Sequence, residues 1–139
     1  MTREALCAAA IEAMGRAYAP YSGYKVGAAL LTADGKVYTG CNIENASYTP
    51  TVCAERTAIF KAVSEGAQEF EAIAVCGGSA DLDVSAELPL TSPCGICRQA
   101  LYEFGGDELT VLLVQSEDKW TEMKLGELLT LGFGPKNLA

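Results

Sequence analysis

The chain has no histidine at any of its 139 positions. Histidine is the commonest zinc ligand and the commonest general base in proteins, so its absence removes both of these uses from the sequence. Any metal site must therefore be built from cysteine, aspartate or glutamate side chains. Any proton transfer must use a carboxyl group, a thiol or a group that the protein binds.

Long apolar segments and basic clusters are also missing. No stretch approaches the roughly 20 apolar residues of a membrane-spanning helix, and the N-terminal segment, which carries Glu12, lacks the uninterrupted apolar region of a secretion signal. Lys and Arg number 10 against 18 Asp and Glu, which gives a formal net charge of −8. We therefore expect a cytoplasmic protein with no membrane partner and no nucleic-acid partner, because a long polyanion would be repelled.

The apolar pattern predicts helices that alternate with strands. Half of the residues are hydrophobic, and the length suits one domain over residues 1–139. Because helices and strands alternate, we expect an α/β fold with a mixed sheet covered by helices. The predicted helices span 3–18, 52–65, 94–104 and 125–131; the predicted strands span 26–33, 36–41, 71–76, 109–115 and 120–124, with a hairpin turn at Asp34-Gly35, a helix stop at Gly66 and a loop over 77–92.

Six cysteines are present, and three of them stand in an informative pattern. Cys53 begins one predicted helix, and Pro93 places Cys94 and Cys97 in the first turn of another. Free backbone N–H groups and the helix dipole favour thiolates at such positions. Because nothing else indicates secretion, a metal site or reactive thiols fit these residues better than disulfides do.

The neighbours of Cys53 indicate what such a metal site could do. Three thiolates leave the fourth position of a zinc ion open, which is typical of catalytic zinc. Glu55 can reach that open side and take a proton from a bound water. Arg56, one helical turn from Cys53, is either a donor to the thiolate sulfurs or a surface arginine. We interpret the remaining cysteines as small buried hydrophobic residues, namely Cys7, Cys41 and Cys76.

These residues resemble the zinc-dependent nucleoside deaminases, and in the three-cysteine form the small homotetrameric cytidine deaminases. The resemblance runs through nearly the whole chain, although the 77–90 segment is longer than expected for the family. It implies a three-layer α/β/α fold with a mixed five-stranded sheet, a zinc ion in each chain and a homotetramer with Tyr48 at a subunit boundary. The matching segments are Ala19–Ser22, Val26–Leu30, Gly40–Asn45, Cys53–Ala58, Pro93–Cys97 and Leu128–Pro135.

The resemblance also implies a reaction. Cys53, Cys94 and Cys97 would hold the zinc ion, and a zinc-bound hydroxide would attack C4 of the pyrimidine in free cytidine or deoxycytidine. Glu55 would be the proton shuttle that protonates N3 and then the departing amine. Ammonia would leave, and uridine or deoxyuridine would remain.

Substrate contacts are implied for five further residues. Asn42 and Glu44 would bind the ribose 3′-hydroxyl. Tyr24, where the family usually has phenylalanine, would pack against the pyrimidine, and Ala54 would also contact the substrate. Phe133 would cover the site of a neighbouring subunit.

Three other functions are consistent with parts of the pattern. The first is deamination of a different aminated heterocycle, such as an aminonucleoside antibiotic, although Asn42-Ile43-Glu44 favours a ribose ligand. The second is editing of a polynucleotide, which the acidic balance disfavours. The third is a zinc-stabilised binding module without catalysis, which Glu55 and the missing fourth ligand disfavour.

Overall fold

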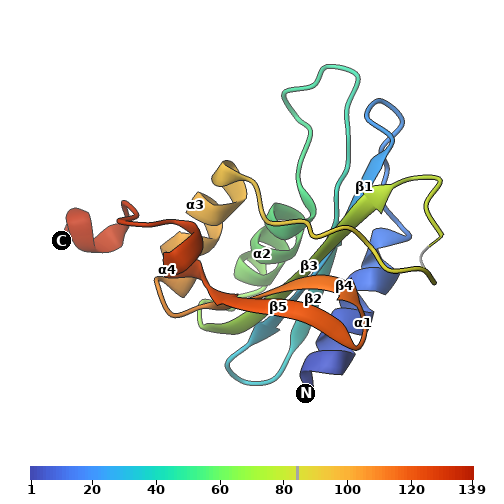
Figure 1. Cartoon of the computed structure of the whole chain (residues 1–139). Helices are drawn as coiled ribbons and strands as arrows, with labels where there is room; N and C mark the ends of the chain where they lie inside the picture. The colour runs from blue at the N-terminus through green and yellow to red at the C-terminus, as the bar shows by residue number, and fades with distance from the viewer. Residues whose placement is uncertain (84) are drawn as a thin grey trace.

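The computed structural model describes residues 1–83 and 85–139; Val84, which falls in the predicted 77–92 loop, lies outside the described residues. Within the described residues, five strands form one sheet in the order β2-β1-β3-β4-β5 (Figure 1). Strands β3 and β4 are parallel, and the other neighbouring pairs are antiparallel. The strands are β1 (Tyr24–Thr32), β2 (Val37–Cys41), β3 (Phe70–Ser79), β4 (Thr110–Ser116) and β5 (Lys119–Lys124).

Helices cover both faces of the sheet. Helix α1 (Arg3–Met14) packs on one face, whereas α2 (Ala54–Ser64) and α3 (Gly95–Gly105) pack on the other. A short helix α4 (Leu125–Leu128) and a 3₁₀ turn η1 (Pro135–Asn137) follow β5. The predicted three-layer α/β/α fold with a mixed five-stranded sheet is therefore confirmed.

None of the helices formed by residues 1–83 and 85–139 has both the length and the apolar character that crossing a membrane requires.

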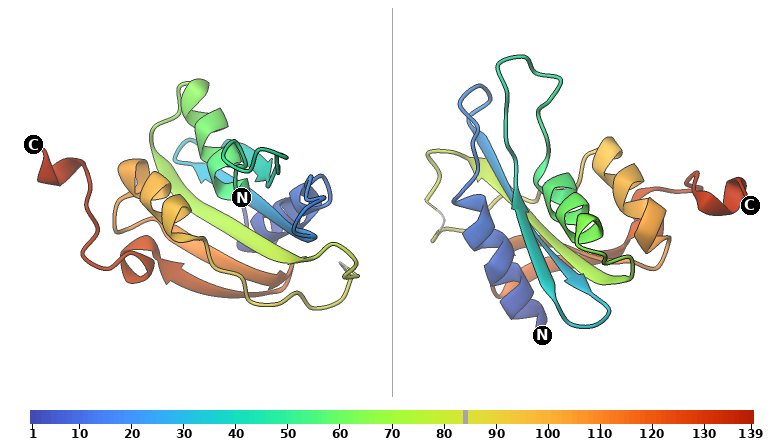
Figure 2. Two further views of the ribbon diagram at one scale, coloured as in Figure 1. Left: turned by 90° about the horizontal axis from the view of Figure 1, so that it is seen from above. Right: turned by 180° about the vertical axis from the view of Figure 1, so that it is seen from behind.

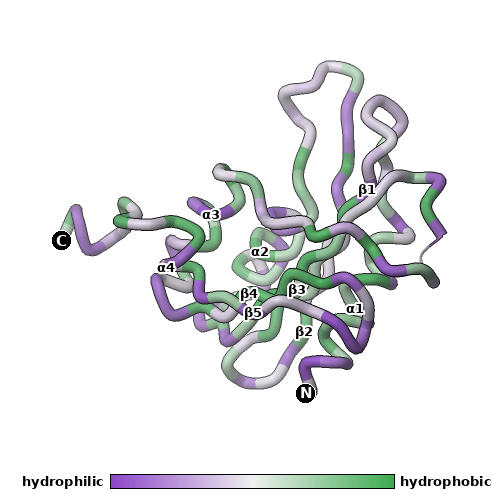
Figure 3. Tube along the Cα trace, in the orientation of Figure 1, coloured by the Kyte–Doolittle hydropathy of each residue, from purple (hydrophilic) through white to green (hydrophobic). Residues whose placement is uncertain are grey.

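Two apolar cores result from the alternation of side chains along the central strands. Leu30 and Ile73 belong to the core beneath α2 and α3, whereas Leu31 and Ala74 belong to the core beneath α1. Figure 3 shows the same distribution, with apolar colour concentrated along the central strands and polar colour in the outer turns. The sheet is thus buried on both sides and provides a rigid base for the segments at its ends.

Gly40 allows α2 to lie directly against β2. A Cβ atom at this position would stand 2.4 Å from the carbonyl oxygen of Ala54 and 2.6 Å from the backbone nitrogen of Ala58. Thr57 strengthens the same contact, because its hydroxyl donates to the carbonyl of Cys41 at 3.0 Å. The first turn of α2 is therefore fixed closely against the sheet.

The turns expected from the sequence are confirmed. The Asp34-Gly35 turn joins β1 to β2, and the Lys36 N–H donates to the Thr32 hydroxyl oxygen at 2.8 Å across it. Gly66 follows α2 with a φ of +100°, as expected for a residue that stops a helix.

The predicted 3–18 helix is too long at its C-terminal end. Helix α1 ends at Met14, and at Tyr18 the backbone bonds to a distant segment instead of continuing the helix. The Tyr18 N–H donates to the Asn42 carbonyl at 2.9 Å, and the Tyr18 carbonyl accepts from the Glu44 N–H at 2.8 Å. The two loops at the top of Figure 1 are thereby joined at their bases.

The predicted 71–76 strand is too short, and the predicted 77–92 loop begins too early. Strand β3 continues to Ser79, and Gly77 pairs with Val26 of β1. Glycine is a poor strand former, so its presence after Cys76 led to a predicted strand that ends too early.

The predicted 125–131 helix is also too long. Helix α4 ends at Leu128, whose carbonyl accepts a hydrogen bond from Arg98 Nη1 at 2.7 Å. Leu131 then takes a positive φ of +54°, which is incompatible with a continuing helix. The chain runs away from the sheet after this point (Figure 2), and it ends in η1, which the sequence pattern did not predict.

Candidate metal centre and active site

Two helix N-termini bring three thiols together. Cys53 precedes the first residue of α2, Cys94 precedes the first residue of α3, and Cys97 is buried in the first turn of α3. The sulfur atom of Cys94 lies 3.7 Å from that of Cys53 and 3.4 Å from that of Cys97. All three sulfur atoms lie within 4.8 Å of one another.

This cluster fits a zinc ion. Tetrahedral zinc with Zn–S bonds of about 2.3 Å requires sulfur atoms about 3.8 Å apart, close to the separations found here. Sulfur donors in this arrangement favour zinc over the harder divalent cations. In the described part of the chain, no cysteine, histidine or carboxylate side chain joins the three thiols as a fourth ligand. The residues therefore suit a zinc ion with one open position.

The charge of the cluster is balanced by an arginine. Nη2 of Arg56 donates to the sulfur of Cys53 at 3.5 Å, so of the two alternatives left open by the sequence the donor is the correct one. Hydrogen bonds from Cys97 and then Arg56 lower the pKa of Cys53 to about 5. The bond to Cys53 and burial raise the pKa of Cys97.

Glu55 is the buried acid of the site. The residue is 3% exposed, and burial raises the pKa of its carboxyl group to about 7. Among residues 1–83 and 85–139, its Oε1 atom has no hydrogen-bonding partner. An unpartnered buried carboxyl oxygen is unfavourable unless a ligand or a proton satisfies it. With this pKa, the group can accept and release a proton near neutral pH.

The other cysteines do not join the cluster. Cys7 and Cys76 are fully buried, and burial raises the pKa of their thiols to about 11 and about 12. Both are inert small hydrophobic residues, as interpreted from the sequence. Cys41 is only half-buried, because it lies at the end of β2, so the interpretation is too strong there.

Asn42 and Glu44 lie on the loop that leaves β2, where their side chains bond to the segment around β1. The Asn42 amide accepts from the Val26 N–H at 2.8 Å and donates to the Tyr24 carbonyl at 2.8 Å. The Glu44 carboxylate accepts from both the N–H and the hydroxyl of Ser22, and these bonds lower its pKa. Glu44 is therefore a charged acceptor with a fixed orientation.

The other predicted contact residues lie at different depths. Tyr24 is 38% exposed at the start of β1, and its hydroxyl bonds to the hydroxyl of Thr91 at 2.6 Å. Ala54 is fully buried at the first position of α2. Phe133 and Tyr48 are both exposed, Phe133 on the C-terminal segment and Tyr48 on the loop between β2 and α2.

Arg98 is a supporting residue that the sequence analysis missed. Its guanidinium group donates to the Pro93 carbonyl at 2.7 Å, the Ser92 hydroxyl at 3.0 Å and the Leu128 carbonyl at 2.7 Å. It thereby fixes the segment that carries Cys94. Its place directly after the second cysteine of the Cys-x-x-Cys pair is the feature of the sequence that indicates this role.

Comparison with known proteins indicates a zinc site, as the geometry does. Residues 1–113 match the family model described as the cytidine and deoxycytidylate deaminase zinc-binding region. The chain belongs to the cytidine deaminase family. The matched region of this family contains the three clustered cysteines and Glu55, whereas Phe133 lies beyond it. The family model and the cluster together assign zinc as the metal of the site.

Individual family members are similar over the full length. A cytidine deaminase from Sporosarcina psychrophila is 44% identical over 139 residues, which cover 100% of this chain and 96% of the relative. One from Halalkalibacterium halodurans is 44% identical and covers 99% of this chain and 98% of the relative. The crystal structure of cytidine deaminase from Burkholderia pseudomallei is 47% identical, with a TM-score of 0.84 over 96% of this chain and 100% of that chain.

Proposed function

We propose that this protein hydrolytically deaminates free cytidine and deoxycytidine, giving uridine or deoxyuridine and ammonia. The observation that carries the proposal is the buried Glu55 carboxyl group beside a three-thiol cluster, with one oxygen that has no partner in the described residues. A structural zinc site has no use for such a group, whereas a hydrolytic site requires it.

The first half of the reaction adds water across the C4–N3 bond of the pyrimidine. Cys53, Cys94 and Cys97 would hold the zinc ion, which would lower the pKa of a water molecule and so supply the hydroxide nucleophile. Glu55 accepts the proton that this water loses and transfers it to N3. The new C–O bond makes C4 tetrahedral. Burial makes Glu55 suitable for this step, because its raised pKa lets both protonation states be reached at neutral pH.

The second half removes the amine. Glu55 accepts the proton of the new C4 hydroxyl and delivers it to N4, after which the C4–N4 bond breaks. Ammonia leaves, the C4 carbonyl forms, and the proton on N3 remains in the product. Cytidine and one water thus give uridine and ammonia, and Glu55 returns to its initial state.

Sugar and base contacts are part of the same proposal. Asn42 and Glu44 bind the ribose 3′-hydroxyl, and the lowered pKa of Glu44 supports this because a charged carboxylate is a strong acceptor. Tyr24 and Ala54 line the pyrimidine side. Phe133, exposed on the C-terminal segment, covers the site of a neighbouring subunit.

Assembly, domain organisation and location complete the proposal. We propose that residues 1–139 form one domain that assembles into a homotetramer. The exposed apolar side chains of Tyr48, Leu131 and Phe133 support the assembly. All six cysteines, which all lie in the described residues, are unpaired, and this supports a reducing cytoplasmic compartment.

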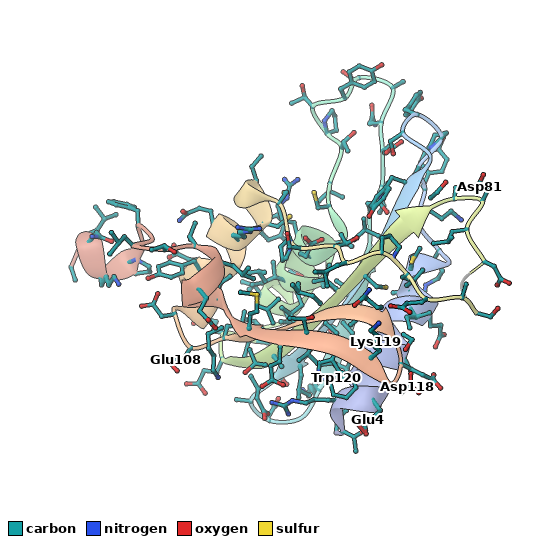
Figure 4. All side chains as sticks on the ribbon, viewed as in Figure 1. Glu4, Asp81, Glu108, Asp118, Lys119 and Trp120 are labelled. Atoms are coloured by element: carbon teal, nitrogen blue, oxygen red, sulfur yellow. The ribbon has the colours of Figure 1, made fainter. Side chains whose placement is uncertain are left out.

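The proposal predicts a narrow preference for free nucleosides. Cytidine and deoxycytidine should release ammonia at a much higher rate than cytidine monophosphate or a single-stranded oligonucleotide. The charged Glu44 carboxylate repels a phosphate on the sugar, and the net charge of −8 adds to this at long range. Figure 4 shows acidic side chains such as Glu4, Asp81 and Asp118 pointing outward from separate parts of the chain.

Ammonia release from each compound at equal concentration is the measurement, and kcat/KM for the monophosphate should be at least about tenfold below that for cytidine. Free cytosine serves as the matched control for the sugar contacts. It should also react poorly, because Asn42 and Glu44 lose their hydroxyl partner. Equal turnover of the monophosphate and cytidine would contradict the role proposed for Glu44.

A further inference from the structure

The backbone of Tyr24 is bonded directly to Asn42 and is linked to Glu44 through Ser22. Its carbonyl accepts from the Asn42 amide at 2.8 Å, and its N–H donates to the Ser22 hydroxyl oxygen at 3.0 Å. The same Ser22 hydroxyl donates to the Glu44 carboxylate. A shift of Tyr24 therefore moves Asn42 directly and Glu44 through one intervening side chain.

The side chain of Tyr24 is bonded to the chain segment that leads to Cys94. Its hydroxyl bonds to the hydroxyl of half-buried Thr91 at 2.6 Å, and Thr91 precedes Cys94 by three positions. The segment between them is rigid, because Pro93 is buried and its carbonyl accepts from Arg98 at 2.7 Å. The Tyr24–Thr91 bond therefore joins the sugar-binding side of the site to the segment that carries a metal ligand.

Gly77 makes room for this bond. It lies in β3 beside Val26, and a Cβ atom there would stand 3.0 Å from Cε1 of Tyr24. The same atom would stand 3.2 Å from the Tyr24 hydroxyl oxygen and 3.2 Å from Cγ2 of Thr91. The tyrosine ring and the threonine side chain both occupy the space that a larger residue would fill, so the strand, the ring and the 91–94 segment form one packed unit.

We propose that Thr91 is a positioning residue that, through Tyr24, sets the span between the sugar-binding pair and the metal centre. The inference rests on the proposed function, since it assumes that a nucleoside bridges these two parts of the site. The span between C4 and the 3′-hydroxyl of a nucleoside is short and limited in range, so both ends engage together only if the site holds the matching distance. Loss of the Thr91 hydroxyl should therefore weaken the use of the 3′-hydroxyl more than it weakens the chemistry at C4.

The test compares cytidine with 3′-deoxycytidine, which lacks only the 3′-hydroxyl. We expect Thr91→Val and Tyr24→Phe each to lower kcat/KM for cytidine by about 2- to 12-fold, the value of a neutral hydrogen bond. The much lower kcat/KM of Thr91→Val for 3′-deoxycytidine should stay within about twofold of wild type, so the preference between the two substrates falls. Because both changes break the same bond, the double variant should lose no more than the larger single effect.

Thr91→Ser is the matched control, because it keeps the hydroxyl and should keep the wild-type substrate preference. Zinc content should be the same in all variants. Equal losses of kcat/KM for both substrates would show a merely structural role and overturn the inference. An unchanged preference between the two substrates in Thr91→Val would also overturn it. So would a double variant in which the two single effects multiply. A wild-type protein that does not deaminate cytidine at all would instead contradict the proposed function.

Discussion

Glu55→Gln is expected to lower kcat for cytidine by at least about 10²–10⁴-fold, the usual contribution of general acid–base catalysis. Glutamine has nearly the same shape as glutamate, but it cannot accept and return a proton. The proposed reaction passes protons through this one side chain to both N3 and N4, so the substitution impairs both proton transfers. Zinc content should be unchanged, since Glu55 lies outside the three-thiol cluster.

The same variant should be as stable as wild type or slightly more stable. Glu55 is 3% exposed, and burial of a charged group without a partner is unfavourable. Steady-state kinetics, zinc analysis and thermal unfolding check the three expectations. Glu65→Gln, an exposed change just after the other end of α2, is the matched control and should keep full activity. A Glu55→Gln protein that retains about a tenth of wild-type kcat would rule out the shuttle role.

Cys94→Ala is expected to remove the zinc ion. The variant leaves only two thiols in the cluster, and two ligands do not hold zinc as three do. Because the binding energy of a metal site is partly folding energy, the midpoint of thermal unfolding should also fall, by at least about 5 °C. Little of this fall can come from lost packing, since the Cys94 side chain is exposed before the first turn of α3.

Metal analysis after gel filtration and calorimetry with and without a chelator test this expectation. The chelator should lower the unfolding midpoint of wild type and leave that of Cys94→Ala unchanged. Cys41→Ala is the matched control, because Cys41 lies outside the cluster, and it should retain its zinc. Full zinc occupancy in Cys94→Ala would show that the metal, if present, lies elsewhere.

Local sequence signals predicted the parts of the site that depend on helix starts. Pro93 indicated where α3 begins and Gly66 where α2 ends, and the predicted 52–65 and 94–104 helices placed Cys53, Cys94 and Cys97 at two helix N-termini. That these termini converge could only be expected from the resemblance. Convergence depends on the crossover between the parallel strands β3 and β4, a long-range feature that periodicity does not contain.

The errors occurred where tertiary contacts override local preference. Helix α1 stops early because Tyr18 bonds to the 42–44 segment, and α4 stops early because Arg98 binds the Leu128 carbonyl. The extension of β3 through Gly77 depends on the neighbouring strand and on the Tyr24 ring. The burial of Glu55 also depends on tertiary contacts, since a glutamate in the first turn of a helix is usually exposed.

Titration of zinc into the metal-free protein, with cytidine deamination followed by the loss of ultraviolet absorbance, tests the central claim most directly. Activity should be absent without metal, rise in proportion to added zinc and level off at about one zinc ion per chain, as three thiolates with one open position require. Full deamination of cytidine by protein shown to contain no metal would contradict the account. So would zinc bound at this ratio with no deamination.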